Sequence, residues 1–117
     1  MEQNKETTKK AVSLSKPNNL AGLIDYQKSA VVSRTLIKKK SGTVTIFSFD
    51  KGEGLSEHIA PFDAMVLILD GIAEINIEGK PNRVECGESI LLPEGKTHSL
   101  KAIERFKMLL IMVKSSD

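Results

Sequence analysis

The feature that most limits the fold is a series of short apolar runs separated by turn residues. Most runs are rich in β-branched residues, and glycine, proline, asparagine or aspartate lies between them at fairly regular spacing. The runs are VVSRTLI, GTVTIFSF, AMVLILD, IAEINIE, NRVEC, SILLP, HSLKAI and FKMLLIMVK. They are too short and too β-branched for a helical protein. The pattern predicts an all-β chain arranged as a sandwich or a barrel.

Some strands and one turn can be predicted in more detail. Residues 72–78 alternate between apolar and polar side chains, which is typical of a strand that is buried on one face. The Asp70-Gly71 pair lies between two apolar runs and predicts a β-hairpin. Residues 64–69 and 108–113 are apolar at every position, so both faces of these strands need cover. One face meets the core, and the other needs a second layer or a second subunit. We therefore expect a homodimer.

Length and composition favour a single domain. The chain has 117 residues, enough for one hydrophobic core. Residues 1–16 are polar and are expected to form a flexible N-terminal lead, followed by a barrel domain over residues 17–117. Asn18 or Asn19 is expected to cap one helical turn near Leu20. No apolar segment approaches the roughly 20 residues of a membrane span, and the N-terminus lacks a signal-peptide stretch, so we expect a cytoplasmic protein with no membrane partner.

The net charge and aromatic content bear on nucleic-acid binding, and the single cysteine bears on disulfide formation and reactivity. The net charge is +2, and aromatic residues make up 4% of the chain. A nucleic-acid-binding face would be more broadly basic and would carry aromatic side chains that stack on bases, so we expect no nucleic-acid partner. The single cysteine, Cys86, excludes an intrachain disulfide. Because it has no basic neighbour in the sequence, we predict a small packing residue rather than a reactive thiol.

The two histidines lie within two spaced patterns of turn residues. The first pattern contains Gly52, His58 and Gly71, and the second contains Gly87, Pro93, Gly95 and His98. These patterns, within residues 52–71 and 87–102, resemble the two motifs of the cupin superfamily, Gly-x5-His-x-His-x3,4-Glu-x6-Gly and Gly-x5-Pro-x-Gly-x2-His-x3-Asn. The resemblance covers about residues 31–114. It implies a double-stranded β-helix, or jelly-roll barrel, in which the two histidines converge inside the mouth.

The resemblance also implies a metal site, but the ligand set departs from that of the family. Cupins that bind metal supply three histidines and one glutamate to a divalent ion. Here Ala60 and Ala64 stand where the second histidine and the glutamate would be, so His58 and His98 remain. Two imidazoles alone would hold Zn, Fe, Ni or Mn weakly. Asp63 is the nearest carboxylate and is a further candidate ligand if a bulge turns it inward.

Three functions are compatible with this pattern. The first is a binding module that encloses a small organic molecule inside the barrel. We expect its pocket to be lined by Ala60, Met65, Phe106, Met108 and Met112. The second is an enzyme of the isomerase, dioxygenase or decarboxylase type, in which His58 and His98 are the catalytic residues, with or without a metal. The third is a non-catalytic structural dimer whose barrel is vestigial and whose histidines only pack.

Overall fold

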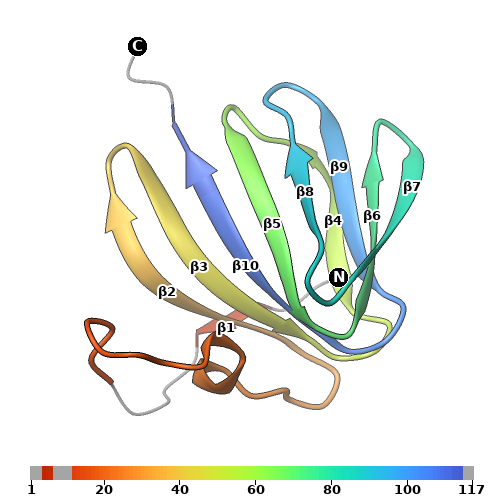
Figure 1. Ribbon diagram of the computed structural model, residues 1–117. Coiled ribbons are helices and arrows are strands. Elements are labelled where there is room, and N and C mark those ends of the chain that lie inside the picture. The colour runs from red at the N-terminus through yellow and green to blue at the C-terminus, as the bar shows by residue number, and fades with distance from the viewer. Residues whose placement is uncertain (1–3, 7–11, 115–117) are drawn as a thin grey trace.

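The computed structural model describes residues 4–6 and 12–114 and shows two β-sheets that face each other (Figure 1). The larger sheet contains, in spatial order, β1 (Asn4–Glu6), β2 (Val31–Lys39), β3 (Gly42–Phe49), β10 (Phe106–Val113), β5 (Asp63–Asp70) and β8 (Ser89–Leu92). The smaller sheet contains β4 (Gly54–Ile59), β9 (Thr97–Ala102), β6 (Ile72–Ile77) and β7 (Lys80–Glu85). Neighbouring strands are antiparallel, except that β1 runs parallel to β2. The all-β jelly-roll barrel expected from the sequence is confirmed.

The turn at Asp70-Gly71 does not form the predicted hairpin. It joins β5 to β6, and these strands belong to different sheets, so the chain crosses from one sheet to the other there. Gly71 has φ +78°, and a Cβ at this position would lie 1.8 Å from the carbonyl oxygen of Arg105. The dipeptide therefore marks a tight turn, as its chemistry requires, but the hairpin prediction was wrong about the pairing.

The core fills the space between the two sheets. Phe49 and Phe106 are fully buried and stack with their ring centroids 4.4 Å apart. Ala73 and Ile75 of β6 face them from the smaller sheet, as the alternation of residues 72–78 predicted. Each fully buried large side chain contributes roughly 1.5–3 kcal/mol to folding. This end of the barrel is packed solid.

A segment before β2 covers half of the outer face of the larger sheet. Its 3-10 turn, η1 (Leu20–Leu23), is capped by Asn19, whose side-chain oxygen accepts a hydrogen bond from the amide of Ala21 at 3.1 Å. The predicted capped turn is thus confirmed. Leu23 and Ile24 pack against Ile46 in a second buried cluster. Cover on both faces of the fully apolar strands β5 and β10 was expected from the sequence. This cluster provides part of that cover on their outer face.

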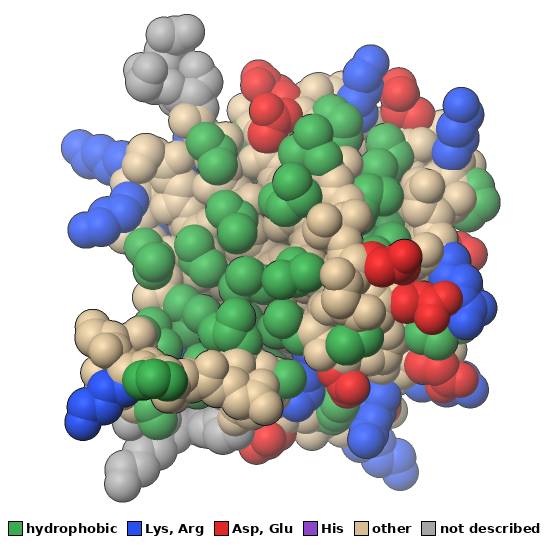
Figure 2. Space-filling model, in the orientation of Figure 1, with side chains coloured by type: hydrophobic (Ala, Val, Ile, Leu, Met, Phe, Trp, Pro, Cys, Tyr) green, Lys and Arg blue, Asp and Glu red, His purple; other side chains and the backbone are tan. Residues whose placement is uncertain are grey.

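Another part of that outer face carries a row of apolar side chains that are largely exposed. Strand register places Leu91, Met65, Ile111, Val44 and Ile37 side by side across β8, β5, β10, β3 and β2. Four of these side chains are exposed, Met65 by 41% and Leu91 by 47%. Figure 2 shows hydrophobic side chains gathered across this face. We call these five residues the apolar row.

The N-terminal range contains a short strand. Residues 4–6, within the lead that was expected to be flexible, form β1 and pair with residues 31–33 of β2. Residues 1–3 and 7–11 of that lead lie outside the described residues, and residues 12–16 contain a turn but no helix or strand. Within the described part of the chain, no helix is long and apolar enough to cross a membrane.

Candidate functional site

The two histidines meet between neighbouring strands of the smaller sheet. His58 on β4 is the register partner of His98 on β9, and their Nε2 atoms are 3.1 Å apart. A bulge between Leu55 and His58 shifts the register by one residue. Without that extra residue, Glu57 rather than His58 would lie opposite His98. The bulge therefore creates the histidine pair.

Backbone carbonyl groups fix the orientation of both imidazole rings. Nδ1 of His58 donates to the carbonyl of Ser56 at 2.8 Å, and Nδ1 of His98 donates to the carbonyl of Lys96 at 3.2 Å. A carbonyl oxygen can only accept, so each neutral ring carries its proton on Nδ1 and presents a lone pair at Nε2. The two rings lie nearly edge to face, at 73°.

Burial sets the protonation of His98. Its residue is 4% exposed. Desolvation lowers the pKa of His98, the neighbouring His58 lowers it further, and the contact with the Lys96 carbonyl opposes the shift. The neutral imidazole is therefore favoured at this position.

The histidine pair borders an apolar cavity of about 190 Å³ between the two sheets. Its wall is formed mainly by Leu55, Leu92, Leu100, Met108, Leu110 and Met112. Of the described residues in this wall, only the two histidines have titratable side chains. A small site with an apolar wall and few polar groups is the usual character of a pocket for an organic ligand.

Three of the five residues expected to line the pocket lie on its wall. Ala60, Met108 and Met112 border the cavity. Met65 does not, because Ala64 and its alternate neighbours on β5 face inward, which turns Met65 to the outer face. Phe106 does point inward, but it is fully buried against Phe49 in the packed end of the barrel. The expectation for these two residues is corrected accordingly.

Asp63, the candidate third ligand, forms a hydrogen bond with the backbone of a turn instead of facing the histidines. Its Oδ1 atom accepts a hydrogen bond from the amide of Glu94 at 2.8 Å and so holds the turn after β8. Ala60 and Ala64 are buried in the cavity wall and offer no donor atom. Among the described residues there is no group of three or more His, Cys, Asp or Glu side chains that could hold a metal ion. The two imidazoles alone do not fit a resident divalent ion, which normally takes at least three protein ligands.

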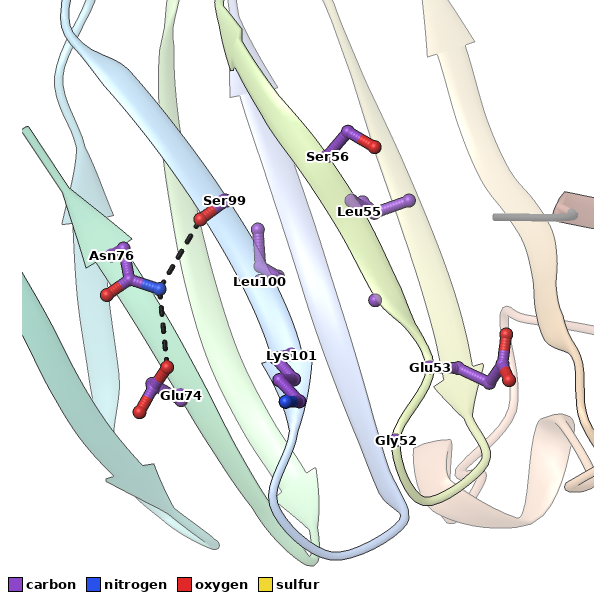
Figure 3. A pocket seen from close by; sticks show the side chains of 10 residues that line it. Gly52, Glu53, Leu55, Ser56, Glu74, Asn76, Ser99, Leu100 and Lys101 are labelled. Atoms are coloured by element: carbon purple, nitrogen blue, oxygen red, sulfur yellow. Dashed lines mark hydrogen bonds between the residues drawn. The ribbon is translucent and has the colours of Figure 1, made fainter. Parts of the chain in front are cut away.

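A second hollow lies on the opposite face of the same sheet. This outer groove, of about 500 Å³, is open and polar, and Ser56, Ser99, Lys101, Glu74 and Asn76 line it (Figure 3). The Asn76 amide lies 3.4 Å from both Ser99 Oγ and Glu74 Oε2. Sequence reasoning did not identify this groove. The alternation of residues 72–78 predicted its polar face, but nothing in the sequence marks a hollow there.

Cys86, which was singled out in the sequence, and Tyr26, the one tyrosine of the chain, lie away from the cavity. Cys86 is exposed rather than packed, and its thiol donates to the carbonyl of Leu69 at 3.2 Å, so the packing prediction was wrong. The Tyr26 hydroxyl donates to Asp70, and the Arg105 guanidinium lies 4.5 Å from the centre of the Tyr26 ring. Burial and the Asp70 carboxylate raise the pKa of Tyr26. This phenol helps to anchor the covering segment.

Comparison with known proteins agrees with the motifs and the topology. Residues 45–114 match the family model described as cupin domain. A conserved protein of unknown function from Streptococcus pyogenes is 39% identical, with a TM-score of 0.86 over 91% of this chain and 93% of that one. A cupin superfamily protein from Desulfitobacterium hafniense is 30% identical, with a TM-score of 0.84 over 91% and 97%. A cupin 2 conserved barrel domain protein from Leptotrichia buccalis is 46% identical, with a TM-score of 0.81 over 83% of this chain and 47% of that one. No curated protein matches the chain.

Proposed function

Because the chain belongs to the cupin superfamily, we propose that it binds a small, mostly apolar organic molecule inside the barrel, beside His58 and His98. The observation that carries this proposal is the cavity itself, which is apolar apart from the two imidazoles at its edge. An apolar wall supplies affinity through buried surface, and a few polar groups orient the occupant. The opposite end of the barrel is filled by the Phe49–Phe106 stack, so the occupant is confined to the histidine end.

The test is to fill the cavity without disturbing the rest of the sheet. Ala64→Leu adds a side chain to the cavity wall, whereas Met65→Leu changes the next residue, which faces outward. A screen of small apolar compounds should find some that raise the melting temperature of the wild-type protein and of Met65→Leu. The same compounds should have no effect on folded Ala64→Leu. Stabilisation that survives in Ala64→Leu would place binding elsewhere and contradict the proposal.

A second candidate function is an enzyme that moves a proton on the bound molecule. It is favoured by the convergence of two Nε2 lone pairs, 3.1 Å apart, at the edge of the cavity. A neutral imidazole is a suitable general base near neutral pH, and the Nδ1 contacts hold both rings in the tautomer that this role needs. Isomerisation and decarboxylation belong to this class. No step is derived through a metal, because the donor set does not fit one.

We also propose that the protein is a homodimer in which the apolar row is covered by a second copy. Unpartnered apolar faces of this kind are rarely left in water, and a two-fold interface is the simplest way to cover one. Ile111→Lys places a charge at the centre of the row and should yield a monomer in light scattering, while Ser99→Lys on the polar sheet should leave the dimer intact. A wild-type protein that is monomeric at micromolar concentration would contradict this part of the proposal.

A further inference from the structure

The contact between the two histidines leaves their Nε2 atoms in need of a hydrogen-bond donor. In the tautomer that lets each Nδ1 donate to its carbonyl, two neutral rings direct two lone pairs at each other across 3.1 Å. Two acceptors at this separation repel unless a proton or a cation lies between or beside them. His98 is 4% exposed, so water reaches its ring poorly, whereas His58 on the edge strand is exposed and can meet water. The occupant of the cavity is therefore the group that can bring a hydrogen-bond donor to the buried Nε2 atom of His98.

Two other ways of meeting this requirement fit the site less well. A proton shared by the rings would leave a cation beside an apolar wall to which no carboxylate of the described residues belongs, with its His98 end buried. Burial already lowers the pKa of His98 in agreement with this cost. A divalent ion would find two imidazoles and no third protein ligand, since Asp63 holds the turn at Glu94. A hydrogen-bond donor on a neutral molecule meets the requirement at no electrostatic cost.

We propose that the occupant is a compact apolar molecule that carries a hydroxyl donor, of the phenol or enol class. Its single hydroxyl proton is shared between the Nε2 atoms of His58 and His98 in a bifurcated hydrogen bond, and its apolar body fills the cavity. The inference rests on the proposed function and names the ligand class for that same site. A carbonyl, ether or carboxylate in the same place would bring a further acceptor and would leave all the lone pairs unmatched.

The size and lining of the cavity agree with a single ring. An apolar cavity of about 150 Å³ in another protein is large enough to hold benzene. The cavity here is about 190 Å³, which leaves room for one further polar group on such a ring. Met108 and Met112 lie on its wall, and thioethers make favourable contacts with aromatic rings. Phenol itself is therefore a suitable probe.

The experiment compares phenol with anisole and toluene by titration calorimetry on the full chain at neutral pH, with a metal chelator present. Anisole replaces the hydroxyl proton by a methyl group, and toluene removes the oxygen. We expect phenol to bind at least tenfold more tightly than either. Equal affinities for the three compounds would overturn the hydroxyl inference but leave the proposed function standing. Failure of all three to bind would overturn both.

Variants separate the hydroxyl contact from the apolar cavity. His98→Leu keeps an apolar side chain of similar size, so it should lose the preference for phenol while still binding toluene. His58→Leu, on the exposed edge strand, gives the same test if His98→Leu does not fold. Ser99→Ala, which faces the outer groove, should keep the full preference. If phenol binds only after the chelator is replaced by Zn²⁺, a metal rather than the hydroxyl contact mediates binding, and the inference fails.

Discussion

The two faces of β4 and β9 differ in polarity and in exposure, although both are formed by the same two strands, whose successive side chains point to opposite faces. The inner face presents His98 and Leu100 to a small apolar cavity, and the outer face presents Ser99 and Lys101 to a wider polar groove. The groove residues bond to one another, as Asn76 does with Ser99, whereas the lone pairs of the histidine pair point only at each other. This contrast shows that exposed polar side chains can form hydrogen bonds with one another or with water. The buried imidazole of His98, with the exposed His58 beside it, is the polar group that we expect a ligand to contact.

The largest difference between the faces should appear in stability. Leu100 is buried in the main core, and Ser99 is its outward neighbour. We expect Leu100→Ala to lower the free energy of unfolding by about 2–5 kcal/mol, because it removes packed methylene groups and leaves a larger void. Ser99→Ala should change it by less than about 0.5 kcal/mol. Urea unfolding measures both, and a similar cost for the two variants would mean that the faces are not distinct.

A smaller effect of opposite sign is expected at His98. In the tautomer that its Nδ1 contact favours, its Nε2 atom meets only the Nε2 lone pair of His58, so the buried imidazole is held at the expense of stability. We expect His98→Leu to raise the free energy of unfolding by about 1 kcal/mol while it abolishes the preference for hydroxyl ligands. Denaturant midpoints at neutral pH provide the measurement. A clear loss of stability would show that the histidine packs for structural reasons.

The dependence of stability on pH should be the smallest of the three effects. The pKa of His98 is lower in the folded protein than the ordinary value of 6.5, so the unfolded chain binds the proton more readily. The contribution of His98 to stability is therefore complete above pH 6.5 and is lost as the pH falls through the folded-state pKa. Wild type should lose stability towards acid faster than His98→Leu. Parallel profiles between pH 8 and pH 5 would contradict the direction of the shift.

Most of the fold was accessible from the sequence because its strands are short, β-branched and bounded by turns. The run that escaped notice is β4, whose residues are largely polar and exposed at the sheet edge. The pairing around Asp70-Gly71 also escaped, because a dipeptide specifies a tight turn but not which sheet the next strand joins. The capped turn near Leu20 was predicted, but the docking of residues 20–30 on the larger sheet was not, because their few apolar side chains do not show which face they will meet.

The candidate site was predictable in part. The spacing of turn residues identified His58 and His98 as partners, and the structure brings them together. The alternation that turns Ala64 inward also turns Met65 outward, so that error lay in the reading of the pattern. The bulge before His58 and the carbonyl contacts of both rings depend on backbone geometry. No residue pattern in the sequence encodes them.

The most direct test of ligand binding inside the barrel uses the methionines as reporters. Met108 and Met112 line the cavity, whereas Met65 lies on the outer face. With methyl-labelled methionine, titration of phenol should shift the NMR signals of Met108 and Met112 and leave that of Met65 in place. A shift confined to Met65, or no shift at Met108 and Met112 at saturating phenol, would contradict the account.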